Sequence, residues 1–200
     1  MIDLKGRKRA APFLAPIAAG LAKIGLTPAI VTSVGLLLTI LGAVWIGLGE
    51  LFAGSLTAAV GVSLDALDGP LARHLGKESD RGAFLETMSD RVGEIAIWVG
   101  LSVYLREQPH LLILCVVALA ASLMVPYVRA KAEYAGLEGK GGWMGRAERM
   151  ILIVLGIGLS GLGVEVFDID ILEPILWVFV VLTVFTVLQR IRKTWQQLEA

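Results

Sequence analysis

The sequence predicts an all-α integral membrane protein with six transmembrane helices and an N-terminal amphipathic helix in the membrane interface. Hydrophobic residues make up 56% of its 200 residues and the mean hydropathy is +0.75, values that a soluble domain of this size rarely reaches. A spanning helix needs about 20 mainly apolar residues. Four long apolar runs meet this length, whereas two others are shorter or carry polar residues. We expect spanning helices over residues 29–48, 51–74, 82–105, 110–136, 144–163 and 171–192.

The segment before the first span has the pattern of an amphipathic helix. Within residues 10–24 the apolar side chains fall near one helix face, and Lys23 lies beside them. Such a pattern is typical of a helix that lies in the membrane interface. We interpret residues 1–25 as a cytoplasmic or interfacial segment of a single membrane domain that covers residues 1–200. The apolar face consists of Phe13, Leu14, Ile17, Leu21 and Ile24.

Lysine and arginine residues predict the orientation of the spans, because cytoplasmic loops of membrane proteins carry an excess of both. Here they gather at the two termini and in the loops after the second and fourth spans, which six helices place on one side. Arg106 alone lies in the loops of the other side, and the last of these loops is acidic. We expect both termini to be cytoplasmic in a multi-pass protein of the plasma membrane. The formal net charge is zero, and we expect no nucleic-acid partner.

Acidic residues lie inside two of the predicted spans, where ionisable side chains are rare and usually functional. Asp65 and Asp68 are three residues apart, and Glu86 and Asp90 are four apart, so each pair shares one helix face. A short polar connection makes the two helices antiparallel, which brings the four carboxylates to a similar depth. Hard oxygen ligands at this density suit Mg²⁺ or Mn²⁺, commonly as a pair of ions. The alternative is a structural set of ion pairs with Arg73, Arg81 and Arg91.

Two glycines flank these carboxylates on the same helices. Gly69 and Gly82 each cost about 1 kcal/mol of helix propensity relative to alanine. A small residue lets the phosphates or ribose of a ligand approach the backbone, and close packing of helices is an equally good reason for it.

The motif formed by these residues resembles the signature of the CDP-alcohol phosphotransferase family, D-x2-D-G-x2-A-R-x8-G-x3-D-x3-D. Seven of its eight fixed positions match with the same spacing. The exception is Glu86, which stands where the family has its third aspartate; it keeps the charge but reaches one methylene further. The matching positions are Asp65, Asp68, Gly69, Ala72, Arg73, Gly82 and Asp90.

The resemblance implies an enzyme with six helices that transfers a phosphatidyl group from a CDP-linked lipid to an alcohol and releases CMP. Asp65, Asp68, Glu86 and Asp90 would hold two Mg²⁺ or Mn²⁺ ions, and Asp90 would also be the catalytic base. The segment around Pro28 and Thr32 resembles the entry to the family's first helix, near the nucleotide. The family also implies a homodimer. The position of the four carboxylates near the cytoplasmic ends of their helices predicts an active site on that side. The residues implied to border the CDP group are Gly69, Ala72, Arg73, Gly82, Pro28 and Thr32.

A second group of basic residues lies at the cytoplasmic ends of the last three predicted spans. Several cations there suit a phosphate on the acceptor alcohol, although snorkelling and membrane topology also explain basic residues at such positions. The stretches 127–137 and 146–149 resemble the phosphatidylinositol phosphate and archaetidylinositol phosphate synthases of the family, which implies inositol 1-phosphate as acceptor. Glycerol 3-phosphate is the near alternative, and a non-catalytic ion carrier is a remote one. The basic residues are Arg129, Lys131, Arg146, Arg149 and Arg190.

Overall fold

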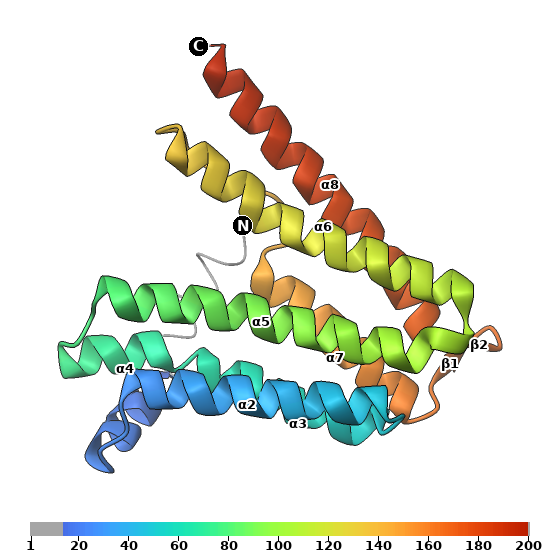
Figure 1. Cartoon of the computed structure of the whole chain (residues 1–200), viewed down its shortest axis with the longest axis horizontal. Coiled ribbons are helices and arrows are strands. Elements are labelled where there is room, and N and C mark those ends of the chain that lie inside the picture. The colour runs from blue at the N-terminus through green and yellow to red at the C-terminus, as the bar shows by residue number, and fades with distance from the viewer. Residues whose placement is uncertain (1–13, 200) are drawn as a thin grey trace. The chain divides into compact units, whose positions relative to one another are not determined.

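The computed structural model describes residues 14–199, and most of them are helical (Figure 1). The described residues form two compact units, one ending at Tyr104 and the other beginning at Leu105. The first unit holds the acidic motif and the second holds the basic residues of the last three predicted spans.

The first unit consists of helices only. After a helix over Leu14–Lys23 come α2 (Pro28–Gly47), α3 (Leu51–Asp65), α4 (Asp68–Leu75) and α5 (Asp80–Tyr104). Leu14 and Leu21 of the first helix pack against a buried cluster that includes Val31 and Leu71, whereas Ile17 and Ile24 are exposed. Part of the predicted apolar face therefore packs inside the protein and part is exposed. The placement of this helix in the membrane interface stays a prediction. Residues 1–13 of the predicted segment lie outside the described part of the chain.

Helix α2 is the centre of this unit, because both α3 and α5 pack against it. Its start follows from local chemistry: Pro28 occupies the first turn and the hydroxyl of Thr27 accepts a hydrogen bond from the Ile30 N–H. Small residues then allow α2 and α3 to approach closely. A Cβ atom on Gly42 would lie 2.5 Å from the carbonyl oxygen of Gly54, so glycine is required at this crossing.

The helix predicted over residues 51–74 is interrupted within the acidic motif. Helix α3 ends at Asp65, Ala66 and Leu67 form a turn, and α4 begins at Asp68. Pro70 explains the interruption, because proline has no N–H to bond the carbonyl of Ala66 four residues earlier and its ring crowds that carbonyl. The prediction of one continuous helix was wrong at this point, although α3 and α4 together still provide a candidate span of 25 residues.

The second unit contains η1 (Leu105–Glu107), α6 (Pro109–Tyr134), α7 (Arg146–Gly161) and α8 (Leu172–Leu198). Both α6 and α7 pack against α8. Between α7 and α8 lies a small antiparallel pair that the all-α prediction did not include, β1 (Glu165–Val166) and β2 (Ile169–Asp170). Asp170 stabilises the return of the chain, because its carboxylate accepts hydrogen bonds from the Ser160 hydroxyl and the Leu172 N–H.

Within residues 14–199, four helical segments are long and apolar enough to cross a membrane, which supports a multi-pass membrane protein. Helices α5 and α7 occupy the other two predicted spans but do not meet the same standard. Charged residues interrupt the apolar character of α5, and α7 has 16 residues, or about 24 Å of helix. The four segments are Pro28–Gly47, Leu51–Leu75, Pro109–Tyr134 and Leu172–Leu198.

Candidate active site

The turn between α3 and α4 carries the first two acidic residues of the motif. Asp65 is the last residue of α3 and Asp68 the first residue of α4, and they are only 7% and 5% exposed. Their neighbour Leu67 is buried in the apolar cluster of this unit. A carboxylate that is charged in such surroundings needs hydrogen bonds or a cation to compensate for the water it has lost.

Thr32 of α2 supplies one such hydrogen bond. Its Oγ1 lies 2.7 Å from Oδ2 of Asp68, and also 3.0 Å from the carbonyl oxygen of Pro28. The hydroxyl has one hydrogen to donate. Its shorter contact is with the Asp68 carboxylate. The start of α2, predicted to border the nucleotide, is therefore joined to the acidic motif.

Glu86 and Asp90 extend the acidic group along α5, one helical turn apart. Asp68 lies within electrostatic range of both Glu86 and Asp65, so the structure brings these three carboxylates into one neighbourhood. Between residues 14 and 199, no three Asp, Glu, His or Cys side chains are close enough to form a complete ligand set. The donor atoms nevertheless fit a hard divalent cation, because they are all carboxylate oxygens and the two aspartates at the turn are buried.

Asp90 has a charged neighbour, Arg91, which the sequence analysis named as an ion-pair partner in the structural alternative to a metal site. The guanidinium of Arg91 places Nη2 3.9 Å from Oδ2 of Asp90 and Nη1 2.5 Å from Oε2 of Glu94. Glu94 is 1% exposed. The three-residue spacing of Arg91 and Glu94 in a predicted span was the signal for this ion pair.

Gly69 and Gly82 do not serve close helix packing within the described structure. The nearest heavy atom to a Cβ on Gly69 would be the Arg73 guanidinium at 3.6 Å, and on Gly82 it would be the Ser79 hydroxyl at 3.3 Å. By contrast, a Cβ on Gly61 would lie 2.5 Å from the Gly35 carbonyl oxygen. Of the two reasons for glycine, ligand approach fits Gly69 and Gly82 better than packing does.

In the second unit, two of the predicted phosphate-binding arginines are held by one loop. Nη1 of Arg149, which is 1% exposed, lies 3.3 Å from the Met144 carbonyl oxygen. Arg190 of α8 donates from Nε to the Gly141 carbonyl and from Nη1 to the Val125 carbonyl of α6. The Met144 N–H donates to the Thr186 hydroxyl of α8. Residues 141–144 therefore contact the start of α7 and the second half of α8, and Arg190 links α8 to α6.

The other three basic residues that were predicted to bind the phosphate have different surroundings from Arg149 and Arg190. Arg129 forms an ion pair with Glu133 on its own helix, with Nε 2.8 Å from Oε1. The ammonium of Lys131 lies 5.4 Å from the centre of the Tyr134 ring. Arg146 begins α7 one turn before Arg149 and is partly buried.

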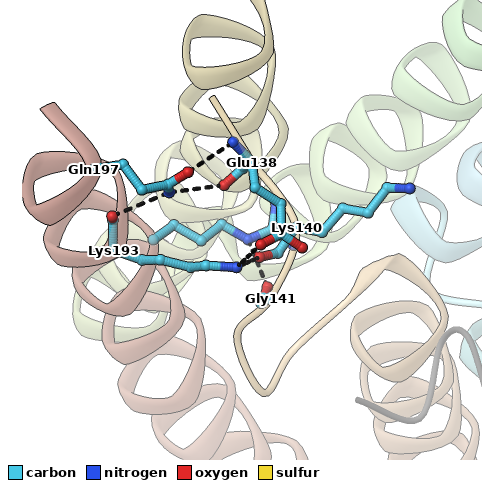
Figure 2. A network of polar contacts seen from close by, with 6 residues as sticks. Glu138, Lys140, Gly141, Lys193 and Gln197 are labelled. Carbon is cyan, nitrogen blue, oxygen red and sulfur yellow. Dashed lines mark hydrogen bonds and ion pairs between the residues drawn. The ribbon is translucent and has the colours of Figure 1, made fainter. Parts of the chain in front are cut away.

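A polar network fastens the loop between α6 and α7 to the end of α8 (Figure 2). Gln197 accepts from the Glu138 N–H and donates to its carbonyl oxygen, at 2.8 and 3.2 Å. The ammonium of Lys193 lies 2.7 Å from the Glu138 carboxylate and 2.9 Å from the Lys140 carbonyl oxygen. The hydrogen bond and the charge of Lys193 lower the pKa of the Glu138 carboxyl below its ordinary value. This loop leads directly into the first turn of helix α7, which carries Arg146 and Arg149.

The helical membrane fold and its acidic motif define an enzyme that acts on CDP-linked alcohols. Residues 25–189 match the model of the CDP-alcohol phosphatidyltransferase family, and the chain belongs to this family. The match spans both units, from the loop before α2 to the last part of α8.

Within the family, the chain is similar to phosphatidylinositol phosphate synthases. The chain is 35% identical over 185 residues to the phosphatidylinositol phosphate synthase of Mycobacterium tuberculosis, covering 90% of this chain and 84% of the relative. It is 36% identical over 187 residues to the enzyme of the same name from Streptomyces avermitilis, covering 89% and 76%. These shares show that the similarity extends over nearly the whole chain.

Solved structures agree with this similarity. The Mycobacterium tuberculosis synthase with CDP-DAG bound has a TM-score of 0.81 at 34% identity, covering 91% of this chain and 93% of the other. The same synthase has been solved in complex with manganese and citrate, again with a TM-score of 0.81 and 34% identity, covering 91% and 88%.

Proposed function

We propose that this enzyme transfers the phosphatidyl group of a CDP-linked lipid, a CDP-diacylglycerol, to inositol 1-phosphate with release of CMP. The observation that carries the proposal is the acidic motif at the α3–α4 turn and on α5, in a chain whose relatives are phosphatidylinositol phosphate synthases. Because the family match spans both units, we treat them as parts of one catalytic domain.

Asp65, Asp68, Glu86 and Asp90 are the residues that we infer to hold the metal, Mg²⁺ or Mn²⁺, as a pair of ions. Burial of the first two aspartates and the electrostatic proximity of Asp68 to both Glu86 and Asp65 support this role. A bound divalent cation would neutralise the diphosphate and stabilise the departing CMP.

The remaining motif residues would bind and orient the CDP group. Gly69 and Gly82 leave space beside the backbone, and the Arg73 guanidinium next to Gly69 suits a phosphate. Ala72 is the other small residue on α4, and Thr32 with Pro28 joins the start of α2 to Asp68.

In the reaction that we propose, Asp90 takes the proton of the acceptor hydroxyl as general base. The hydroxyl oxygen forms a bond to the lipid-bearing phosphorus, the bond between the two phosphates breaks, and CMP leaves with the bonding electrons. Arg149 and Arg190 would bind the acceptor's own phosphate, with Arg146 and either Arg129 or Lys131 beside them. The contacts of Arg149 and Arg190 with the same loop, residues 141–144, support this role for the first two.

We further infer that α5 and α7 complete six spans, that the termini and the active site face the cytoplasm of the plasma membrane, and that the enzyme is a homodimer. The one-sided distribution of lysine and arginine supports the orientation. The charges of α5 are compatible with a span because its acidic residues belong to the proposed site.

The test is an assay of the purified protein with CDP-diacylglycerol and Mg²⁺, in which CMP release is followed with each candidate acceptor. We expect release with inositol 1-phosphate and little with unphosphorylated inositol. Release with glycerol 3-phosphate alone would replace this assignment by phosphatidylglycerophosphate synthesis. Cation flux across vesicles without CMP release would favour an ion carrier. Excess EDTA should stop turnover, and Mg²⁺ or Mn²⁺ should restore it.

Asp68→Asn should lower kcat for CMP release by more than about a hundredfold, the upper range for residues that only support a metal ligand. The amide keeps the shape of the side chain but removes the charge that faces the cation and the diphosphate. Asp80→Asn is the matched control, since Asp80 is exposed at the start of α5. Equal kcat values for the two variants would contradict the metal role of Asp68.

A further inference from the structure

Glu94 is a buried carboxylate that the proposed reaction does not use. It is 1% exposed on α5, one turn beyond Asp90, and it forms an ion pair with Arg91. The Arg91 guanidinium therefore lies between two carboxylates, one buried and unassigned and one proposed as general base and metal ligand.

The two contacts of Arg91 are unequal. The distance from Nη1 to Glu94 is 2.5 Å, within the range of a strong charge-assisted hydrogen bond, whereas Nη2 lies 3.9 Å from Asp90, beyond hydrogen-bond range. Glu94 thus receives the main interaction of the guanidinium. The ion pair between Arg91 and Asp90 is the longer of the two.

We propose that Glu94 is a positioning residue that holds Arg91 away from Asp90 and so keeps the Asp90 carboxylate accessible to a divalent cation and to the acceptor hydroxyl. The proposal rests on the proposed function. The Arg91 side chain is 19% exposed; without the Glu94 charge its guanidinium would lose its shorter ion pair and keep the one with Asp90. A direct Arg91–Asp90 pair would then compete with the cation for the same oxygens.

The backbone around this ion pair is held firmly, so the competition is one between side chains. A Cβ on Gly93 would lie 3.3 Å from Cγ2 of Thr39 and 3.8 Å from Cδ1 of Leu36, which shows that α5 approaches α2 closely here. Both partners of the ion pair project from this stretch of α5. A change at Glu94 is therefore expressed mainly in the position of the Arg91 guanidinium.

The experiment measures Mn²⁺ binding to the purified full-length protein by electron paramagnetic resonance, together with kcat for CMP release. In Glu94→Gln we expect Mn²⁺ affinity and kcat to fall about ten- to a hundredfold, as for other residues that support metal ligands. The double variant Arg91→Met/Glu94→Gln removes the competing cation, and its Mn²⁺ affinity should return to within about threefold of wild type.

Thermal unfolding of each variant identifies a purely structural effect, which would lower stability and leave Mn²⁺ affinity unchanged in the folded protein. Wild-type affinity in Glu94→Gln would overturn the proposal. So would a double variant that binds Mn²⁺ more than about ten times more weakly than wild type, and this second criterion applies even if the single variant does not fold. Failure of the wild-type protein to bind Mn²⁺ or release CMP would instead overturn the proposed function.

Discussion

At the scale of single residues, Thr32 is the contact that joins the buried Asp68 carboxylate to the first long helix. Its hydroxyl lies 2.7 Å from Asp68 in a region where both side chains are less than 10% exposed. Hydrogen bonds to charged groups contribute about 1.5–3 kcal/mol, and a buried acceptor that loses its donor also loses the compensation for desolvation. Thr32 therefore affects both the stability of the fold and the position of a proposed metal ligand.

Thr32→Val keeps the shape of the side chain and removes this donor, so we expect the protein to lose about 1.5–3 kcal/mol of stability and kcat to fall. Thermal unfolding and CMP release measure the two effects. Thr39→Val is the matched control, because Thr39 is equally buried on α2 but its hydroxyl donates to the Gly35 carbonyl of the same helix. Equal losses in the two variants would show that the Thr32–Asp68 contact has no special role.

Glu86 is the one motif position that departs from the family signature, and its role is separately testable. Glu86→Asp should keep appreciable kcat, because the shorter carboxylate restores the family's residue. Glu86→Ala should lose nearly all CMP release, since the cation loses a charged ligand. An Ala variant as active as wild type would show that Glu86 is not a ligand and that the remaining three carboxylates suffice.

The residues of the acidic motif were predictable because their spacing follows the helix repeat and their charges stand out in apolar surroundings. Glu94 was not assigned to the site, although it lies in the same span, because its burial depends on how α5 packs. Arg190 was predicted as a phosphate-binding residue, but its contacts with the backbone could not be predicted. The sequence places it at a helix end, but two of its nitrogens donate to the backbone carbonyls of Gly141 and Val125, which are distant in the chain.

At the scale of elements, the turn between α3 and α4 shows where the hydrophobic pattern is insufficient. The apolar run from residue 51 to 71 favours one helix, whereas Pro70 removes a single hydrogen bond within it. The existence and order of the long helices followed from composition and length. The interruption, and the small β1–β2 pair, depend on local backbone chemistry that a window of average hydropathy does not resolve.

The loop between α6 and α7 is fastened to α8 through Glu138, and this contact should respond to pH. The lowered pKa of Glu138 means that its stabilising contribution is complete above its ordinary pKa of 4.5 and is lost as pH falls through the lower folded-state value. We expect amide hydrogen exchange in residues 138–144, corrected for the intrinsic pH dependence, to become faster as the pH falls below about 4.5.

Lys193→Ala should already show fast exchange in this loop at neutral pH and lose most of the acid-induced change. Arg192→Ala is the control, because Arg192 is the exposed neighbour on α8. An acid response that is the same in Lys193→Ala as in wild type would assign the titration to a group other than Glu138.

At the scale of the whole molecule, the two halves of the proposed reaction belong to different units. The acidic motif lies before Tyr104 and the basic residues lie after Leu105. The motif is specific enough to identify the family from sequence alone. The acceptor is less specific, because basic residues at cytoplasmic helix ends also arise from membrane topology. Kinetics for the two substrates can separate these contributions, since the proposed contacts of the CDP group lie in the first unit and those of the acceptor's phosphate lie in the second.

Arg149→Ala is the sharpest such test, because Arg149 is 1% exposed whereas Arg146, one turn earlier, is only partly buried. A charge-assisted contact to phosphate is worth about 1.5–3 kcal/mol, so the KM for inositol 1-phosphate should rise about 10- to 150-fold. The KM for the CDP-lipid should change little, since its proposed contacts are in the first unit. Steady-state kinetics with inositol 1-phosphate and glycerol 3-phosphate separately provide the measurement.

Arg106→Ala provides the matched control. Arg106 is exposed in η1, just before the start of α6, whereas the proposed phosphate site lies beyond the end of α6. This variant should leave both KM values unchanged. An arginine that only snorkels would lower expression or stability when replaced by alanine, with both KM values intact in the protein that folds. An unchanged acceptor KM in folded Arg149→Ala would therefore refute the phosphate site. A rise for glycerol 3-phosphate alone would identify that compound as the acceptor, because a phosphate-binding arginine affects only the substrate whose phosphate it contacts.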